Sequence, residues 1–173
     1  PGTDIAVLDE DYNQLSSGEI GYLLIRSDNP GFFLGYHNDA DKTAEVIHDG
    51  WYHTGDLAWR DEDGYFWIAG RIDDCFKSRG IFISPYEIEN VLLQHPAIAE
   101  ACIVPLADPE IGNQIRAVCV LKEGTPANDA IAEDIRLNVR NRIAPYKTPH
   151  IVEFIDVLPK SHVGKVLRRE LIS

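Results

Sequence analysis

The sequence lacks several features that would place it in other classes of protein. It has no apolar run of the roughly 18 residues that a membrane-spanning helix needs. Residues 1–4 have neither the basic start nor the apolar middle of a signal peptide. We therefore expect a cytoplasmic protein with no membrane partner. Methionine is absent and the chain opens at Pro1, so we expect it to be part of a longer protein.

Cysteine and positive charge are both scarce. The three cysteines, Cys75, Cys102 and Cys119, show neither CxxC nor mixed Cys/His spacing. This argues against a disulfide framework or a zinc site and favours reduced, structural thiols. The net charge of −12 argues against nucleic-acid binding that is independent of base sequence, because neutralising phosphates takes an excess of Lys and Arg. We expect no nucleic-acid partner.

The negative charge is concentrated in the first part of the chain. Residues 1–73 hold 15 acidic and 4 basic side chains, whereas residues 74–173 hold 13 and 12. Such a change in charge balance indicates two segments of different character. The sequence therefore predicts a domain boundary near residue 73.

The first segment consists of short apolar runs separated by turn residues, which predicts β-rich structure. Four such runs are present: residues 4–8, 19–26, 31–36 and 65–69. Asp61-Glu62-Asp63-Gly64 predicts a hairpin turn, because Asp-Gly supplies the positive φ that tight turns need. A carboxylate metal site is the alternative for this turn, although calcium loops use a longer series of ligands.

The conspicuous aromatic and histidine side chains receive structural interpretations. We expect five aromatic residues to form the core of a β-barrel rather than a stacking platform: Trp51, Trp59, Trp67, Phe32 and Phe33. Paired metal-ligand spacing is absent from the histidines. We expect these to be surface or packing residues: His53, His95, His150 and His162.

The second segment alternates helix and strand signals. Ser84-Pro85-Tyr86-Glu87 has the pattern of a capping box with proline at the first helical position, which predicts a helix over residues 85–94. A second helix is predicted from Asn128 to Ala144, because the residue before a proline is disfavoured in the α region. The remaining runs predict three strands and a short terminal helix: residues 101–105, 117–121, 151–155 and 166–172.

Four motifs carry candidate chemistry. Residues 52–56, YHTGD, place a carboxylate directly after a glycine, which can aim an acceptor at two adjacent hydroxyls such as those of a ribose. An aspartate that merely finishes a turn is the alternative for this motif alone. The other three are GRIDD at residues 70–74, KSRG at residues 77–80 and PKSHVGK at residues 159–165. In their order and spacing these motifs resemble the adenylate-forming superfamily of acyl-CoA synthetases, adenylation domains and luciferases, over essentially the whole chain.

The resemblance implies both a fold and an activity. The fold is α/β (α+β): residues 1–73 are the β-rich C-terminal end of a large domain, and residues 74–173 are a small, mobile α/β domain with a three-stranded sheet and flanking helices. The implied enzyme is an acid–thiol ligase that joins a carboxylic acid to ATP and then passes the acyl group to CoA. The family also implies Mg²⁺, for which we identify no ligands in this chain.

One stretch narrows the resemblance. Residues 80–89, GIFISPYEIE, look most like benzoate and related aryl-CoA ligases, which implies an aromatic acid. Many relatives carry an arginine where this chain has Phe82. Any role of that arginine is therefore not transferred to this chain.

The resemblance also implies roles for individual residues. Asp56 would hold the ribose hydroxyls of the nucleotide, with Arg71 assisting, and Asp73 would be the hinge of the small domain. Lys165 would reach the reacting carboxylate and the α-phosphate. A compact ammonium on a flexible stem suits this role, because it offsets the negative charge that grows in the transition state. The loop that lines the pantetheine tunnel is matched by three residues: Ser78, Arg79 and Gly80.

Some interpretations stay open. The family's phosphate-binding loop and acid pocket lie upstream of the region that this chain matches, so we expect the isolated chain to be inactive. An adenylation domain that loads a carrier protein and a noncatalytic module that keeps the fold are the alternatives. Lys165 also resembles the acetylation target of related synthetases, which implies a lysine acetyltransferase and deacetylase as partners, because acetylation removes its charge.

Overall fold

The computed structural model describes residues 2–172 of the chain. Contacts divide the protein into a first unit, Pro1–Asp73, and a second unit, Asp74–Ser173. Both units contain sheets, and three α-helices occur within the described residues, so the predicted mixed α/β fold class is confirmed. None of the helices described is long and apolar enough to cross a bilayer.

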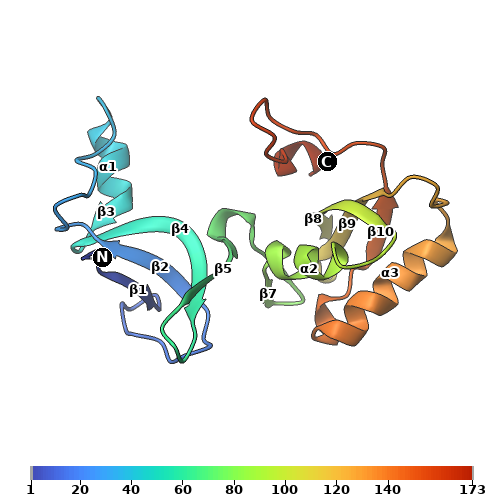
Figure 1. Cartoon of the computed structure of the whole chain (residues 1–173), viewed down its shortest axis with the longest axis horizontal. Helices are drawn as coiled ribbons and strands as arrows, with labels where there is room; N and C mark the ends of the chain where they lie inside the picture. Colours follow the sequence, from blue (N-terminus) through green and yellow to red (C-terminus); the bar gives the residue numbers. More distant parts are fainter. Residues whose placement is uncertain (1, 173) are drawn as a thin grey trace. The chain divides into compact units, whose positions relative to one another are not determined.

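The first unit is built on one sheet whose strand pairs are antiparallel. The strands follow the order β1-β2-β4-β3, and β5 pairs with β4. The long β4 strand curves between its neighbours in Figure 1. The elements of this unit, with a 3₁₀ turn that ends at the first residue of the next unit, are β1 (Ile5–Leu8), β2 (Gly21–Arg26), α1 (Ala40–Val46), β3 (Ile47–His48), β4 (Trp51–Arg60), β5 (Phe66–Arg71) and η1 (Ile72–Asp74).

Of the secondary-structure predictions for the first unit, the hairpin turn is confirmed and one strand is wrong. The hairpin turn is confirmed, because the amide of Asp61 donates to the carbonyl of Tyr65 at 3.0 Å and Gly64 has a φ of +87°. The prediction of a strand at residues 31–36 is wrong, because this segment forms no ladder with a neighbouring strand in the part of the chain described. The α1 helix that follows was not predicted. It begins after Asp39, whose carboxylate accepts a hydrogen bond from the amide of Lys42.

The aromatic side chains of the first unit do not form the expected core. Trp59 and Trp67 stack with centroids 5.8 Å apart, but Trp67 remains 52% exposed. The rings of Phe32 and Phe33 pack against Tyr52 in a surface cluster. Aliphatic residues of the sheet supply the buried side chains: Val7, Leu8, Leu24, Leu57, Ala58 and Ala69.

The second unit contains a three-stranded sheet of order β10-β9-β8 and a two-stranded ribbon of β6 and β7. The β8 and β9 strands form an antiparallel hairpin, and β10 runs parallel to β9. The elements are β6 (Phe76–Ser78), β7 (Ile81–Ile83), α2 (Pro85–Leu92), β8 (Ile98–Asp108), β9 (Gly112–Leu121), α3 (Asp129–Arg142), η2 (Pro145–Lys147), β10 (Ile151–Phe154) and η3 (Arg168–Leu171).

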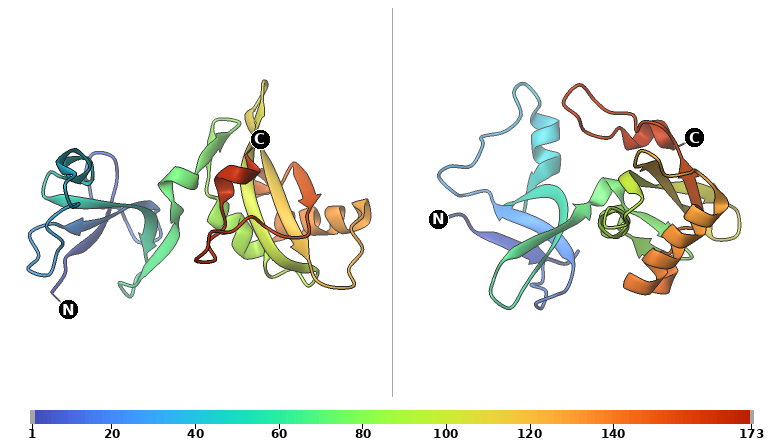
Figure 2. Two further views of the ribbon diagram at one scale, coloured as in Figure 1. Left: turned by 90° about the horizontal axis from the view of Figure 1, so that it is seen from above. Right: turned by 45° about the vertical axis from the view of Figure 1, so that its right-hand side comes forward.

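The three-stranded sheet carries an apolar layer on each face, because successive side chains of a strand point to opposite sides. The α2 and α3 helices cover one face, and its main buried residues are Ile83, Ile88, Leu92, Ile103, Ile115, Ala117, Cys119, Ile135 and Val139. The C-terminal segment covers the other face, whose buried residues are Cys102, Val104, Val118 and Leu158. Figure 2 shows α3 in orange and the C-terminal segment in red on opposite sides of the sheet.

The helix predictions for the second unit are confirmed in place but not in every detail. Asn128 caps α3 by accepting from the amide of Ile131 at 3.0 Å, and the helix ends before Pro145 as predicted. The α2 helix begins at Pro85 as predicted, but the capping box is wrong, because the Ser84 side chain makes no cap hydrogen bond. Instead of the predicted helix over residues 166–172, the structure has only the 3₁₀ turn η3. A β-bridge between residues 160 and 166 precedes this turn.

Candidate functional site

Asp56 projects from a bulge in β4. Leu57 pairs with Tyr22 and His53 pairs with Leu24, so the three residues 54–56 oppose a single residue of β2. The hydroxyl of Thr54 donates to the carbonyl of the facing residue at 2.9 Å and accepts from the amide of Asp56 at 3.0 Å. Bulges re-aim a side chain away from the ladder. This arrangement therefore fixes where the carboxylate of Asp56 points.

Arg71 is the partner of Asp56 across the strands. The two residues are paired in register, and Nη1 of Arg71 lies 3.1 Å from Oδ1 of Asp56 and 2.7 Å from the carbonyl of Thr54. Gly55 has a φ of +75°, and a Cβ at this position would lie 2.7 Å from Nη2 of Arg71. The positive φ therefore favours glycine here, and a Cβ would displace the guanidinium from its present position.

One oxygen of Asp56 remains available. Oδ2 accepts no hydrogen bond from residues 2–172, and the side chain is 30% exposed. The same guanidinium reaches further, because Nη2 of Arg71 lies 3.2 Å from Oδ2 of Asp73. The structure thus brings together three predicted site residues of the first unit: Asp56, Arg71 and Asp73.

Lys165 lies on a loop with internal hydrogen bonds. The amide of Ser161 donates to the carbonyl of Lys165 at 2.8 Å, and the hydroxyl of Ser161 accepts from the amide of Lys165 at 3.2 Å. Gly164 has a φ of +81°, which closes the turn. The Lys165 side chain is exposed, and its ammonium forms no ion pair with any residue that the structure describes. The loop therefore presents a free cation to solvent.

Ser78, Arg79 and Gly80, which we predict to line a pantetheine tunnel, lie where β6 turns into β7. This loop packs against β9. Ser78 is buried and its hydroxyl donates to the carbonyl of Asn113 at 2.7 Å, so it holds the loop in place. Arg79 and Gly80 form the turn, with φ values of +53° and +76°. Open space surrounds the position of a Cβ at Gly80, so the backbone there is accessible.

The histidines pack or pair with neighbours, as predicted. His95 is buried, with Nε2 3.2 Å from Asp134, and Nδ1 of His150 accepts from the amide of Ile115 at 3.0 Å. His53 stacks on His48 with ring centroids 3.9 Å apart. No group of three or more His, Cys, Asp or Glu side chains within residues 2–172 is placed to hold a metal ion.

The three cysteines are thiols and not halves of disulfides. Burial raises the pKa of Cys75 and of Cys102 to about 11, and the pKa of Cys119 to about 12. Because the thiolate is the nucleophilic form, these side chains are inert at neutral pH. The raised pKa values agree with the interpretation of the three cysteines as structural thiols.

Arg168 is a conspicuous residue to which the motifs assigned no role. Its side chain is 19% exposed and forms ion pairs with Glu89 at 2.6 Å and with Asp74 at 3.4 Å. Glu89 is 79 positions away in the sequence. The one sequence feature that marks this residue is local: Arg168 and Arg169 form a pair of arginines shortly after the PKSHVGK motif.

Comparison with known proteins identifies the family. Residues 87–165 match the family described as AMP-binding enzyme C-terminal domain. Residues 87–165 therefore carry an AMP-binding enzyme C-terminal domain. It is 41% identical to 4-hydroxybutyrate–CoA ligase 1 of Metallosphaera sedula and 39% identical to acetyl-coenzyme A synthetase of Bacillus subtilis, in each case over 99% of this chain. The resemblance inferred from the motifs is thereby confirmed.

Solved structures of AMP-binding enzymes show the same fold. A benzoate CoA ligase from Burkholderia xenovorans superposes on 100% of this chain with a TM-score of 0.87 and 33% identity. An anthranilate CoA ligase in complex with anthranoyl-AMP superposes on 98% with a TM-score of 0.87 and 34% identity. The chain covers 34% and 33% of these two proteins, and 31% and 30% of the two curated relatives. It therefore spans about a third of the length of the proteins that it matches.

Proposed function

We propose that this chain is the C-terminal part of an ATP-dependent acid:CoA ligase. In the first step a carboxylate oxygen attacks the α-phosphate of ATP, which forms an acyl-adenylate and releases pyrophosphate. In the second step the CoA sulfur attacks the acyl carbon, the thiol proton is lost and AMP leaves. The observation that carries the proposal is the free ammonium of Lys165 on its hydrogen-bonded loop. Relatives named as CoA ligases and acyl-CoA synthetases support it.

Residues 1–73 are, in this proposal, the end of a large adenylate-forming domain that binds the nucleotide. Asp56 accepts from the two ribose hydroxyls, and its support is the unpaired Oδ2 oxygen on a fixed bulge. Arg71 orients Asp56 by holding the other carboxylate oxygen and the carbonyl of Thr54. A hydrogen-bonded partner that fixes an acceptor in advance reduces the entropy lost on binding.

Residues 74–173 are, in this proposal, a small domain that moves about Asp73. Lys165 donates to the carboxylate and the α-phosphate in the first step, where its charge offsets the repulsion between two anions. For the second step the domain turns and brings the Arg79–Gly80 backbone to the pantetheine arm. The positive φ of both residues and the open space at Gly80 support a close backbone approach.

Mg²⁺ accompanies ATP in such reactions, where it would neutralise phosphate charge. The described residues of this chain do not fit a metal site, because no sufficient cluster of His, Cys, Asp or Glu is present among them. We therefore assign no metal ligand here. The roles of Asp56, Arg71 and Lys165 given above require none.

The acid substrate that we propose is aromatic. Its support is the similarity of residues 80–89 to benzoate ligases and the match to the benzoate and anthranilate ligase structures. The curated relatives include ligases named for aliphatic acids, such as 4-hydroxybutyrate. Assays of the intact enzyme with benzoate, anthranilate, 4-hydroxybutyrate and acetate decide the class. Higher kcat/KM for an aliphatic acid would overturn the aromatic assignment.

The central experiment separates the two half-reactions in the intact enzyme that contains this chain. Replacing Lys165 by Ala should slow ATP–pyrophosphate exchange about 10²–10³-fold, the loss typical of removing one donor to a developing negative charge. Thioester formation from supplied acyl-adenylate should change little. Lys160→Ala is the matched control, because it removes a lysine of the same loop that is paired with Glu100 at 2.6 Å. Equal loss of both half-reactions in the Lys165 variant would contradict its role.

Three further assays test the rest of the proposal. The isolated chain should show no pyrophosphate exchange. CoA, rather than a carrier protein, should accept the acyl group from the intact enzyme. A noncatalytic module is the correct description if the intact enzyme binds neither ATP nor AMP by calorimetry.

We also propose Lys165 as a target of a lysine acetyltransferase and a deacetylase. Its exposed position on a surface loop supports access by such enzymes. Acetylation removes the charge and should therefore reproduce the loss seen with Lys165→Ala. Unchanged pyrophosphate exchange after stoichiometric acetylation at Lys165, measured by mass spectrometry, would reject this regulation.

A further inference from the structure

Arg168 forms a branched contact with the body of the second unit. Nη1 lies 2.6 Å from Oε1 of Glu89 on α2, 3.2 Å from Sγ of Cys102 on β8, and it also donates to the carbonyl of Ile103. Nη2 lies 3.3 Å from the second oxygen of Glu89. Bidentate pairing between a guanidinium and a carboxylate fixes orientation as well as distance. The Arg168 side chain is therefore held in one direction.

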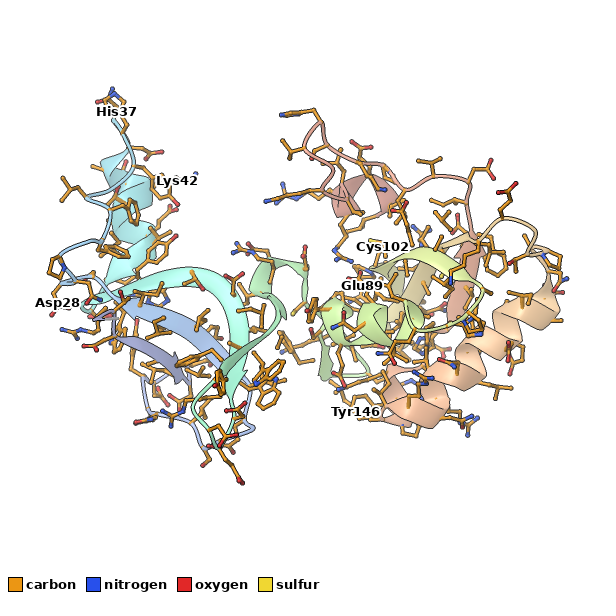
Figure 3. The ribbon with its side chains drawn as sticks, viewed as in Figure 1. Asp28, His37, Lys42, Glu89, Cys102 and Tyr146 are labelled. Carbon is orange, nitrogen blue, oxygen red and sulfur yellow. The ribbon has the colours of Figure 1, made fainter. Side chains whose placement is uncertain are left out.

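The partner of Arg168 is itself fixed. Oε1 of Glu89 accepts a hydrogen bond from the amide of Ile103 at 2.7 Å, so the carboxylate joins α2 to β8 independently of the arginine. Figure 3 shows the labelled Glu89 and Cys102 close together, on the helix and on the strand beside it. Arg168 thus docks onto a site that the core of the unit has already set.

The Lys165 loop, residues 159–167, follows Leu158, which is buried in the core of the second unit, and precedes Arg168. Its internal hydrogen bonds are local, and residues 162–167 are exposed. The ion pair of Lys160 with Glu100 lies at the surface, with both side chains more than a third exposed. Such pairs contribute little to stability because water screens them. Arg168, three residues after Lys165, is the largely buried charged residue that holds the C-terminal end of this loop.

Arg168 also reaches the start of the second unit. Its Nε lies 3.4 Å from Oδ1 of Asp74, whereas Nη2 of Arg71 lies 3.2 Å from Oδ2 of the preceding Asp73. Two consecutive carboxylates are therefore each paired with an arginine of their own unit. Asp73 is connected to Asp56 through Arg71, and Asp74 is connected to the Lys165 loop through Arg168.

We propose that Arg168 is a positioning residue that fastens the Lys165 loop to Glu89 on α2 and to Asp74, so that rotation at the Asp73–Asp74 junction moves Lys165 as part of a rigid body. The proposal rests on the function assigned to Lys165 above. The anchoring and its effect on catalysis can be tested separately. Hydrogen exchange of the loop amides reports on the anchoring, and the rate of pyrophosphate exchange reports on catalysis.

Hydrogen exchange tests the anchoring in the intact enzyme. Replacing Arg168 by Ala should raise exchange of the loop amides at Ser161, Gly164 and Leu167, which donate within the loop, while β8 and β9 keep their protection. Arg169→Ala is the matched control, because this neighbouring arginine is exposed and forms no ion pair within the described residues. Unchanged loop exchange in the Arg168 variant would overturn the proposal.

Kinetics test the consequence for catalysis. Arg168→Ala should lower kcat of pyrophosphate exchange about 10²-fold, the loss expected when a reacting group is misplaced by about 1 Å. Thioester formation from supplied acyl-adenylate should stay within about twofold of the parent enzyme, because that step does not use Lys165. Asp74→Asn, which breaks only the junction contact, should give a smaller loss of the same kind. Equal loss of both half-reactions would overturn the proposal.

Two further variants distinguish anchoring of the loop from a general loss of stability. If Arg168→Ala also raises exchange throughout β8 and β9, Arg168→Lys becomes the deciding variant, because it keeps the charge but loses the fork. That variant should still slow pyrophosphate exchange more than thioester formation, and a parent-like rate would overturn the proposal. Lys165→Ala, measured in the same series, tests the proposed role of Lys165 separately from the anchoring by Arg168. If it leaves pyrophosphate exchange unchanged, the role of Lys165 fails, whereas the hydrogen-exchange result still decides the anchoring.

Discussion

The two units bury their apolar residues to very different degrees. Of the 21 buried hydrophobic residues found in the described chain, 6 lie in the first unit and 15 in the second. Both apolar clusters belong to the second unit, one on each face of its sheet. Large apolar side chains are exposed in both units, for example Leu34 in the first and Val157 in the second. The difference therefore lies in the core: the second unit has one of its own, whereas the first buries few apolar side chains.

The proposed function explains this difference. A domain that must turn about a hinge has to be stable without its neighbour, and a closed core provides that stability. The end of a larger domain has no such requirement, because the rest of that domain covers it. The proposed site residues are divided between the units in the same way. In the first unit Asp56 lies on a bulge and pairs with Arg71, whereas in the second unit Lys165 lies on a loop that we propose Arg168 anchors.

Separating the units should produce the largest effect. Residues 74–173 alone should unfold in one cooperative transition in urea, because both faces of their sheet are covered. Residues 1–73 alone should show no such transition, because six buried side chains do not offset the entropy of ordering the chain. Circular dichroism during urea titration measures both. A cooperative transition of residues 1–73 would contradict the comparison.

The core of the second unit is tested by two adjacent leucines. Leu92 is fully buried, whereas Leu93 is 49% exposed. Leu92→Ala should lower the free energy of unfolding by about 2–5 kcal/mol, because it removes buried atoms and leaves a cavity. Leu93→Ala should cost less than about 1 kcal/mol, because little apolar area leaves contact with protein. Urea unfolding of residues 74–173 measures both, and similar losses would show that the core is less closed than we infer.

Two glycines test the nucleotide site that we propose for the first unit. Gly55→Ala and Gly64→Ala both place a side chain at positive φ, which costs about 1–2 kcal/mol of stability. Only at Gly55 does the new Cβ meet the Arg71 guanidinium, since open space surrounds Gly64. Gly55→Ala should therefore also weaken AMP binding about tenfold or more, because a hydrogen bond to a charged group contributes about 1.5–3 kcal/mol. Calorimetry on the intact enzyme measures this, and equal affinities of the two variants would reject the role of Arg71.

The sequence predicted the second unit better than the first because there the local signals coincide with burial. The Asn128 cap, the stop at Pro145 and the Val- and Ile-rich strands all agree with the packing. The α1 helix escaped prediction because it buries no residue and so has no apolar stripe. Its one signal was the Asp39 cap. The tryptophans of the first unit, of which Trp67 is 52% exposed, were misassigned to a core, because aromatic content alone does not show which face of a sheet is covered.

The sequence predicted only those candidate site residues that lie within short contiguous motifs. The glycine and carboxylate of the Thr54–Asp56 motif pointed to a ligand, but the guanidinium that lies against the glycine comes from Arg71 on another strand. The partners of Arg168 include Ile103 and Glu89, which lie 65 and 79 positions away in the sequence. No local periodicity encodes such contacts. Long-range ion pairs therefore require the folded structure.

The smallest expected effect is a pH dependence of the second unit. Burial, together with the charges of Arg79 and Arg136, holds the pKa of His150 below its usual 6.5, while Asp108 opposes the shift. In the folded state Nδ1 of this imidazole accepts from the amide of Ile115, which requires the neutral form. The unfolded chain takes up the proton more readily. The contribution of His150 to stability is therefore complete above pH 6.5 and declines as the pH falls through the lowered folded pKa.

His150→Asn tests this dependence, because the amide oxygen can accept from Ile115 but does not titrate. Urea unfolding of residues 74–173 between pH 7.5 and 5 should show a shallower loss of stability in this variant than in the parent. The pKa of His150, measured by NMR titration of its ring protons, should lie below 6.5. A value at or above 6.5 would contradict the inferred burial. Burial and the charge of His48 lower the pKa of His53 in the same direction, so the first unit should add its own acid-sensitive step in the intact enzyme.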